Sequence, residues 1–198
     1  MDFKEYVYLL RSDLYRYSGK VDAKAALYNW LRQPGFKFSF WLRTCNFLQR
    51  RKPTRYTIYP IARLFLDHYT FKFGIYIPYE TQVASGLHIG HFGGIVVNEN
   101  AIIGKNCNLS HGVTLGQTNR GKRQGSPVIG DNVYIGPGAK VIGHVRVGNN
   151  VAIGANCVVT SDIPDNAVVV GIPGRVISYD GAEGYVNNTD YEALSGVS

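Results

Sequence analysis

The sequence has few cysteines and no long apolar run. Its three cysteines, Cys45, Cys107 and Cys157, are widely spaced and form no metal-ligand pattern, so we expect reduced structural thiols and no bound metal. No stretch reaches the roughly 18 uninterrupted apolar residues that a membrane span needs. The start, MDFKEYVYLL, lacks the basic residues followed by an apolar segment that mark a signal peptide. Together these features predict a cytoplasmic protein.

Acidic residues are also scarce. The chain has 14 aspartates and glutamates and 21 lysines and arginines, which gives a formal net charge of +7. Such an excess favours an anionic partner, but it does not choose among nucleic acid, acidic glycan, phosphate-rich cofactor and membrane surface. The chain has no helix in which basic and aromatic residues alternate as single-stranded nucleic acid prefers, so we expect no nucleic-acid partner.

The first 75 residues are rich in aromatic side chains and have a helical pattern. Apolar residues three and four positions apart predict two or three helices, over 22–31, 38–49 and 58–69. Proline and glycine residues separate these segments. The basic run 50–52 fits a solvated turn, and the aromatic residues around it also allow contact with a membrane surface.

From residue 83 onward an aliphatic residue recurs every six positions, often followed by glycine. A period of six fits neither an amphipathic helix nor an ordinary strand, so it predicts a solenoid. Each hexapeptide would form a short strand and one corner of a triangular coil, and three hexapeptides would close a coil of about 18 residues. The aliphatic positions are Val83, Ile89, Val97, Ile103, Leu109, Leu115, Ile129, Ile135, Val141, Val147, Ile153 and Val159.

Two interruptions of the repeat indicate functional positions. The first adds two residues after Ile89, and the second inserts a loop over 119–126, where long loops in a regular fold tend to be functional. His91 follows Ile89 by two positions, as His111 follows Leu109. Their separation equals one coil plus the two added residues, so both histidines are predicted on the same side, one coil apart.

Four motifs resemble those of the hexapeptide acyltransferases, in particular the serine acetyltransferases and their polysaccharide-modifying relatives. They are IGHFGGIVVNENAIIG, SHGVTLGQT, VIGDNVYIGPGAKVIG and VVVGIPGRVI. The resemblance covers roughly residues 76–178. It implies a mainly β fold: a left-handed parallel β-helix over 76–178, preceded by a small helical region over 1–75 and followed by a tail over 179–198.

The resemblance also implies a reaction. In that family acetyl-CoA binds between neighbouring subunits of a trimer, so we expect a homotrimer or a hexamer of two trimers. The family's base matches His91, and a neutral imidazole can take the proton of an acceptor hydroxyl. His111 remains open between support of the site and ordinary packing. Glu99 or a backbone carbonyl would orient His91.

The same family implies a set of coenzyme A contacts in the later coils. Arg175, in the closing motif, is suited to a coenzyme A phosphate. The loop cations could hold nucleotide phosphates or an acidic acceptor, or they could be merely solvated. The predicted cofactor-binding residues are Thr118, Lys122, Arg123, Ala139, Ala155, Thr160 and Arg175.

Several positions depart from the serine acetyltransferase pattern. Gly90 and Tyr76 stand where those enzymes have aspartates, Gly125 and Ser126 replace an Arg-His pair, and the SGVS end lacks the terminal isoleucine. These losses favour a sugar hydroxyl in polysaccharide synthesis as the acceptor, held by hydrogen bonds and the aromatic side chains of Tyr76, Tyr79 and Phe92. The alternatives are O-acetylation of L-serine in cysteine synthesis and a binding module without catalysis.

Overall fold

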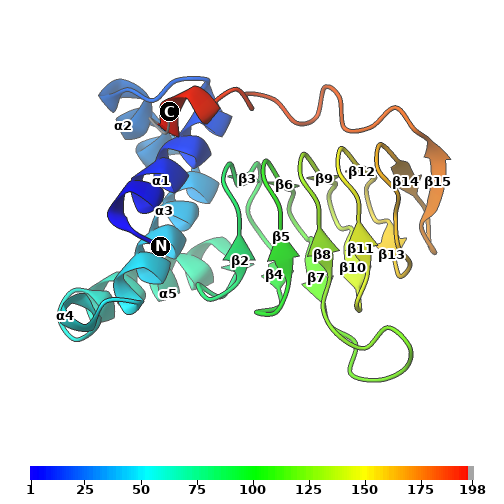
Figure 1. Ribbon diagram of the computed structural model, residues 1–198, viewed down its shortest axis with the longest axis horizontal. Coiled ribbons are helices and arrows are strands. Elements are labelled where there is room, and N and C mark those ends of the chain that lie inside the picture. Colours follow the sequence, from blue (N-terminus) through cyan, green and yellow to red (C-terminus); the bar gives the residue numbers. More distant parts are fainter. Residues whose placement is uncertain (196–198) are drawn as a thin grey trace.

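The computed structural model describes residues 1–195, with helices before residue 74 and strands after it (Figure 1). Of the SGVS end, residues 196–198 lie outside the described part. Among the described residues no helix is both long and apolar enough to cross a membrane. The helices are α1 (Phe3–Ser18), α2 (Ala23–Arg32), α3 (Pro34–Gln49), α4 (Lys52–Arg55) and α5 (Tyr59–Phe73), with a 3₁₀ turn, η1 (Glu192–Ser195), near the other end.

Local sequence sets where the helices start and stop. The carboxylate of Asp2 accepts a hydrogen bond from the N–H of Glu5, and that of Asp22 does the same for Ala25, so α1 and α2 both begin at an aspartate cap. Helices α1 and α5 end at Gly19 and Gly74, whose φ angles of 63° and 61° favour glycine.

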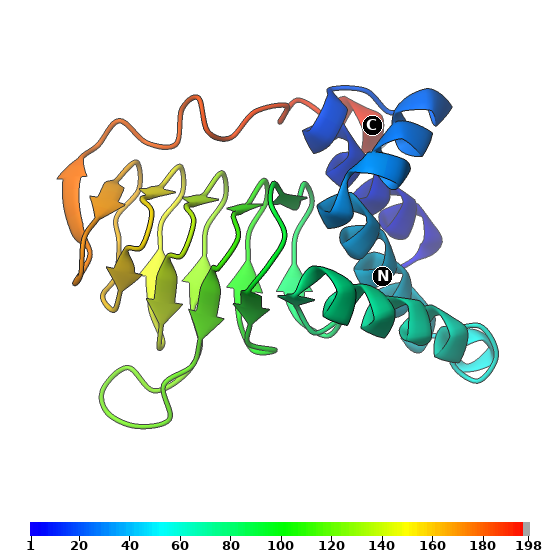
Figure 2. The same cartoon turned by 180° about the vertical axis from the view of Figure 1, so that it is seen from behind.

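The strands form three sheets, parallel except at β15, so that each coil has three sides. The coils lie side by side along the long axis of the molecule (Figures 1 and 2). Sheet A contains β1 (Ile75–Tyr76), β4 (Ile95–Val97), β7 (Thr114–Gly116), β10 (Lys140–Ile142) and β13 (Val158–Val159). Sheet B contains β2 (Gln82–Val83), β5 (Ile102–Ile103), β8 (Val128–Ile129) and β11 (Arg146–Val147). Sheet C contains β3 (His88–Ile89), β6 (Asn108–Leu109), β9 (Tyr134–Ile135), β12 (Ala152–Ile153), β14 (Val168–Val170) and the antiparallel β15 (Arg175–Ser178).

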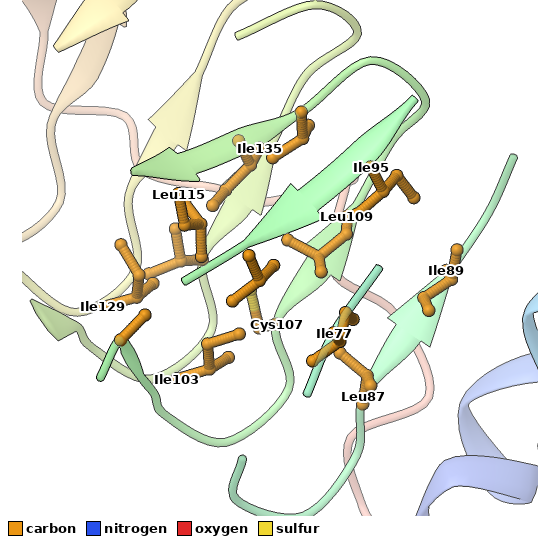
Figure 3. Packing of buried hydrophobic residues seen from close by; sticks show 14 of the residues in the cluster. Ile77, Leu87, Ile89, Ile95, Ile103, Cys107, Leu109, Leu115, Ile129 and Ile135 are labelled. Carbon is orange, nitrogen blue, oxygen red and sulfur yellow. The ribbon is translucent and has the colours of Figure 1, made fainter. Parts of the chain in front are cut away.

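The predicted repeat is confirmed as a stack of parallel coils. Successive aliphatic residues face each other between coils, as Leu109 pairs with both Ile89 and Ile135. Their side chains fill the interior of the coil (Figure 3), and the three are at most 1% exposed. Burial of such side chains supplies most of the stabilisation of a solenoid. The stack begins at β1, one strand before the first position that the sequence repeat marks.

Helix α1 was missed by the apolar pattern because its buried face carries polar side chains. Ser12 and Asp13 are at most 1% exposed. The Ser12 hydroxyl accepts a hydrogen bond from the N–H of Gly86 at 3.0 Å, and the Asp13 carboxylate accepts one from Leu87 at 2.8 Å. These side chains satisfy main-chain groups of the first coil, where no further coil stacks. The expected two or three helices were therefore too few.

Helix α3 adds Arg43 to these contacts, and we call α1 and α3 together the helical cap. The guanidinium of Arg43 forms a buried ion pair with Asp13, with both N···O distances 3.1 Å. It also donates to the main-chain carbonyls of Val83 and Ala84. The ion pair thus joins two helices to the open edge of the first coil.

After β15 the chain returns along the outside of the coils to the helical region (Figure 1). In this return segment, 179–191, the carbonyl of Asn187 accepts a hydrogen bond from Arg16 at 2.7 Å. The buried Tyr191 donates its hydroxyl to Asn106 at 2.6 Å. The two ends of the described chain therefore meet at the same end of the solenoid.

Candidate active site

The two predicted histidines come together on one edge of the solenoid. Strands β3 and β6 pair so that Ile89 lies beside Leu109, which carries His91 and His111 to the same turn of adjacent coils. Their ring centroids are 6.0 Å apart with an interplanar angle of 72°, and both side chains are exposed. We call this edge, between sheets C and A, the histidine edge; it comprises residues 90–94, 110–113, 136–139 and 154–157.

Glycines line the histidine edge beside the imidazoles. Gly94, Gly112 and Gly138 have φ angles of 67°, 70° and 72°, which side chains rarely tolerate. They stack so closely that a Cβ on Gly112 would lie 3.3 Å from the Cα of Gly138. The edge therefore presents bare main chain along which an extended ligand could lie beside the histidines.

The turn that carries His91 is held from the helical side. The hydroxyl of Tyr17, on α1, accepts a hydrogen bond from the N–H of Ile89 at 3.0 Å and donates to its carbonyl at 3.1 Å. Gly35, at the start of α3, lies so close that a Cβ there would be 2.2 Å from the Ile89 carbonyl oxygen. This support two residues before His91 was not predicted, because nothing in the sequence links Tyr17 to the repeat.

Lys140 is a second residue that the sequence reasoning missed. Its ammonium donates to the carbonyl of Gly112, one residue after His111. Lys140 lies on β10, whose residues are paired with β7. The contact fixes the turn after His111 and places a cation at the histidine edge.

His88 lies next to the site and is held neutral. Its ring packs against Tyr17, with the centroids 4.4 Å apart. Burial lowers the pKa of His88 to about 4, and the charges of Arg16 and His91 act in the same direction. His88 therefore supports the strand rather than the chemistry.

We expect His88 to make the fold sensitive to acid. The unfolded chain binds a proton at His88 near pH 6.5 and the native protein only near pH 4. The free energy of unfolding should thus fall as the pH drops through this window, by at most about 3 kcal/mol. His88→Gln should reduce that fall, as measured by urea unfolding across the window. His68→Gln, an exposed control, should not, and equal slopes for wild type and His88→Gln would contradict the assignment.

Glu99 is not brought to His91. It follows β4, at the turn between sheets A and B, whereas His91 precedes that strand. Glu99 lines a cavity of about 220 Å³ with Tyr76, Asn98 and Gly116. Within one chain Glu99 therefore does not orient His91, and Tyr17 holds the main chain two residues before it.

The inserted loop also lies at this second edge, which we call the loop edge (residues 98–101, 117–127 and 143–145). Thr118 and Gly125 bridge its base, and Arg123 forms an ion pair with Asp162 at 2.8 Å. Arg123 is thus engaged within the chain, while Lys122 is exposed. The width of sheet A separates this loop from the histidines.

The remaining predicted contacts divide between the two edges. Ala155 is exposed at the histidine edge, and Arg175 is exposed on β15, beside the end of β14. Ala139 is fully buried, and its N–H already donates to the carbonyl of Gly136, so it offers no donor to a ligand. Thr160 is exposed and follows β13, toward the side of the loop edge.

The aromatic residues predicted to hold an acceptor are also dispersed. Tyr76 and Phe92 are each 54% exposed, on sheet A and the histidine edge. Tyr79 is partly buried, with its ring 5.7 Å from Tyr59 and under the guanidinium of Arg63. These three rings form no common platform.

Comparisons with known proteins decide the family. A family model described as bacterial transferase hexapeptide (six repeats) matches residues 126–161. The chain is 39% identical over 149 residues to a serine acetyltransferase of Synechococcus elongatus, covering 75% of this chain and 59% of that protein. It matches the crystal structure of Brucella abortus serine acetyltransferase with a TM-score of 0.73 and 30% identity, over 89% of this chain and 70% of that chain. The chain belongs to the hexapeptide-repeat acyltransferases, in the serine acetyltransferase-like group.

Structures from this group also include complexes. The Brucella abortus enzyme is known with coenzyme A, and the Neisseria gonorrhoeae enzyme with serine (TM-score 0.71, 29% identity, 89% of this chain and 70% of that chain). This chain spans just under three fifths of the length of the curated relatives it matches, 59% and 57% for two of them.

The prediction of a sugar acceptor is wrong. It rested on four departures from the family pattern, among them Gly90 and Tyr76. It gave them more weight than the similarity along the rest of the chain. Relatives at 39% and 43% identity are serine acetyltransferases, and a matching structure holds serine. Replacement of single polar groups can be compensated by other side chains, so their loss does not by itself change the acceptor.

Proposed function

We propose that this member of the serine acetyltransferase-like group transfers the acetyl group of acetyl-CoA to the hydroxyl of L-serine. The observation that carries the proposal is the exposed pair His91 and His111 on a glycine-lined edge, in a chain of this family. An exposed imidazole can take the proton of an acceptor hydroxyl, and the open main chain beside it leaves room for an extended thioester ligand.

In the proposed reaction His91 acts as general base. Its neutral imidazole takes the proton of the serine hydroxyl as the oxygen attacks the thioester carbonyl. The tetrahedral intermediate carries an oxyanion, for which main-chain N–H groups of the glycine turns are candidate donors. When the intermediate collapses, the C–S bond breaks, and the imidazolium returns the proton to the sulfur of coenzyme A.

We infer that two copies of the chain build each site. The histidine edge and the loop edge are separated by sheet A, yet both carry predicted contacts, such as Ala155 and Thr160. A ligand that uses both edges needs the loop edge of a second copy against the histidine edge of the first. This requirement supports a homotrimer of left-handed β-helices, as the family resemblance implies. The three buried free cysteines fit a reducing compartment, and we infer a cytoplasmic location from them.

The proposed site must hold the ammonium and carboxylate of serine without the family's usual residues. At the loop edge Glu99 supplies an exposed carboxylate, beside the hydrogen-bonded pair Asn98 and Ser126 (2.9 Å). Lys122, exposed in the loop, supplies a cation. With two copies in contact, these groups would face the histidines of the neighbour, where they could take the ammonium and the carboxylate respectively.

Coenzyme A would lie along the histidine edge. Ala155 is exposed there, and Arg175 offers a guanidinium at its far end, suited to a phosphate. The only intramolecular hydrogen bond of that guanidinium among residues 1–195 is a long one, 3.3 Å, to the carbonyl of Gly174. The crystal structure of the Brucella abortus enzyme with coenzyme A supports acetyl-CoA as the donor.

The test is release of free thiol from acetyl-CoA by the full chain with L-serine. We expect thiol release that saturates with L-serine and stoichiometric O-acetylserine, detected by mass spectrometry. L-alanine is the matched control, because it has the same ammonium and carboxylate without the hydroxyl, and it should give none. Absence of serine-dependent release, with coenzyme A still raising the thermal midpoint, would refute serine as the acceptor; no thermal shift would refute the transferase itself.

A further inference from the structure

The helical region contains a long stretch without acidic residues. Residues 23–66 include no aspartate or glutamate. The segment also holds both tryptophans of the chain, Trp30 and Trp41. Its nine basic residues are Lys24, Arg32, Lys37, Arg43, Arg50, Arg51, Lys52, Arg55 and Arg63. Of these, Arg43 and Arg63 pair with aspartates outside the segment, so most of this positive charge is uncompensated.

The end of this stretch exposes apolar side chains beside the cations. On α5 the side chains of Ile61, Leu64 and Phe65 are 57%, 70% and 45% exposed, while Ala62 and Leu66 face the core. At 100° per residue the three exposed positions lie on one side of the helix, away from the two buried ones. Large apolar groups that gather on a surface indicate a contact site.

Helix α4 brings the charge to the same end of the molecule. It projects at the far corner of the helical region, next to the start of α5 (Figures 1 and 2). Arg50, Lys52 and Arg55 are exposed there, and no ion pair among residues 1–195 involves them. Tyr56 and Ile58 follow, 79% and 54% exposed. We call Arg50, Lys52, Arg55, Tyr56, Ile58, Ile61, Leu64 and Phe65 the basic apolar patch.

We propose that the basic apolar patch binds the surface of an anionic lipid bilayer. Cations beside exposed aliphatic and tyrosine side chains on a helix are what interfacial binding uses: the cations meet the head groups, and the apolar side chains enter the acyl boundary. A second copy of the chain would bring like charges together at this corner. Nucleic acid would prefer flat rings for stacking, whereas Ile58, Ile61 and Leu64 are aliphatic and one face of the Phe65 ring is covered by Trp41.

The chain carries its own reporter for this contact. Trp41 stacks on Phe65 with the ring centroids 4.5 Å apart and the planes 11° apart, and Trp30 lies 6.2 Å from Trp41. Insertion of the patch into an interface would therefore alter the surroundings of both tryptophans. A blue shift of their fluorescence should accompany binding.

The test is co-sedimentation of the full chain with phosphatidylcholine vesicles that either contain or lack phosphatidylserine. We expect binding and a blue shift only with phosphatidylserine, and loss of both at high salt, since screening weakens the attraction of exposed charges. Equal partitioning onto both kinds of vesicle, or none onto either, would overturn the proposal. Binding of single-stranded RNA by the chain, without binding to either kind of vesicle, would also overturn it.

Charge reversal locates the surface. Each basic side chain near an anionic leaflet contributes about a fivefold gain in partitioning, so Lys52→Glu with Arg55→Glu should lower binding by at least about 25-fold. Lys4→Glu with Arg11→Glu makes the same charge change at exposed positions of α1 and should lower it far less. Ile61→Ser with Leu64→Ser should also weaken binding. Circular dichroism establishes that each variant is folded, and equal losses in the two charge-reversed variants would place the contact elsewhere.

Discussion

Replacing His91 by alanine is expected to lower kcat for acetyl transfer by about a thousandfold. The side chain is exposed and contributes nothing to the core, so the coils should remain stacked. The loss reflects the missing acceptor for the hydroxyl proton, and KM for acetyl-CoA should change little. Thiol release under saturating substrates measures kcat, and circular dichroism with the thermal midpoint checks the fold.

A matched control is available in the same chain. His68→Ala removes an exposed imidazole from α5, away from the histidine edge, and should leave kcat unchanged. His111→Ala should fall between the two if His111 supports its neighbour across the 6.0 Å between the rings. Activity within a few fold of wild type in the His91→Ala protein would exclude His91 as the base.

Replacing Arg43 by methionine is expected to lower the free energy of unfolding by about 3–5 kcal/mol. The substitution would leave the buried carboxylate of Asp13 without its cation and remove donors from the carbonyls of Val83 and Ala84. Buried polar groups without partners are costly, and here they belong to the edge on which all later coils stack. Urea unfolding followed by circular dichroism measures the effect.

Two further variants separate the buried pair from ion pairs in general. Asp13→Leu combined with Arg43→Met removes both charges and should cost less than the two single changes together, because no unpaired charge remains. Arg63→Met breaks the exposed pair with Asp67, 2.9 Å long and 41% exposed on each side, and should cost less than about 1 kcal/mol. A loss below about 1 kcal/mol for Arg43→Met would show that the cap does not hold the first coil.

The coils could be predicted because a solenoid repeats the same burial at every turn. Ile103, Leu109 and Leu115 occupy equivalent positions and are at most 1% exposed, so the pattern is visible in the letters alone. Helix α1 could not, because Asp13 and Ser12 are buried for their hydrogen bonds rather than for apolar contact. An apolar periodicity detects residues that are buried for apolar contact and misses residues that are buried for their hydrogen bonds.

The site was predictable only in part, for a related reason. The pairing of His91 with His111 follows from counting residues around the coil. Glu99 is close to His91 in the sequence but lies beyond β4, on another edge, and only the assignment of turns to edges reveals this. The acceptor was misjudged because single replacements, such as Gly90, do not show which other groups take over.

The return segment should change how the protein unfolds. A stack of coils that touch only their neighbours can lose its outermost turn without disturbing the rest, and such arrays often unfold from an end. Here the chain leaves the last coil and is fastened to α1 through Asn187. Tyr191 then fastens it to the first two coils, because its hydroxyl lies 3.1 Å from Ser85 and 2.6 Å from Asn106. Fraying of the far coil is thereby coupled to release of the near one, so we expect a single cooperative transition in which the helical cap and the solenoid melt together.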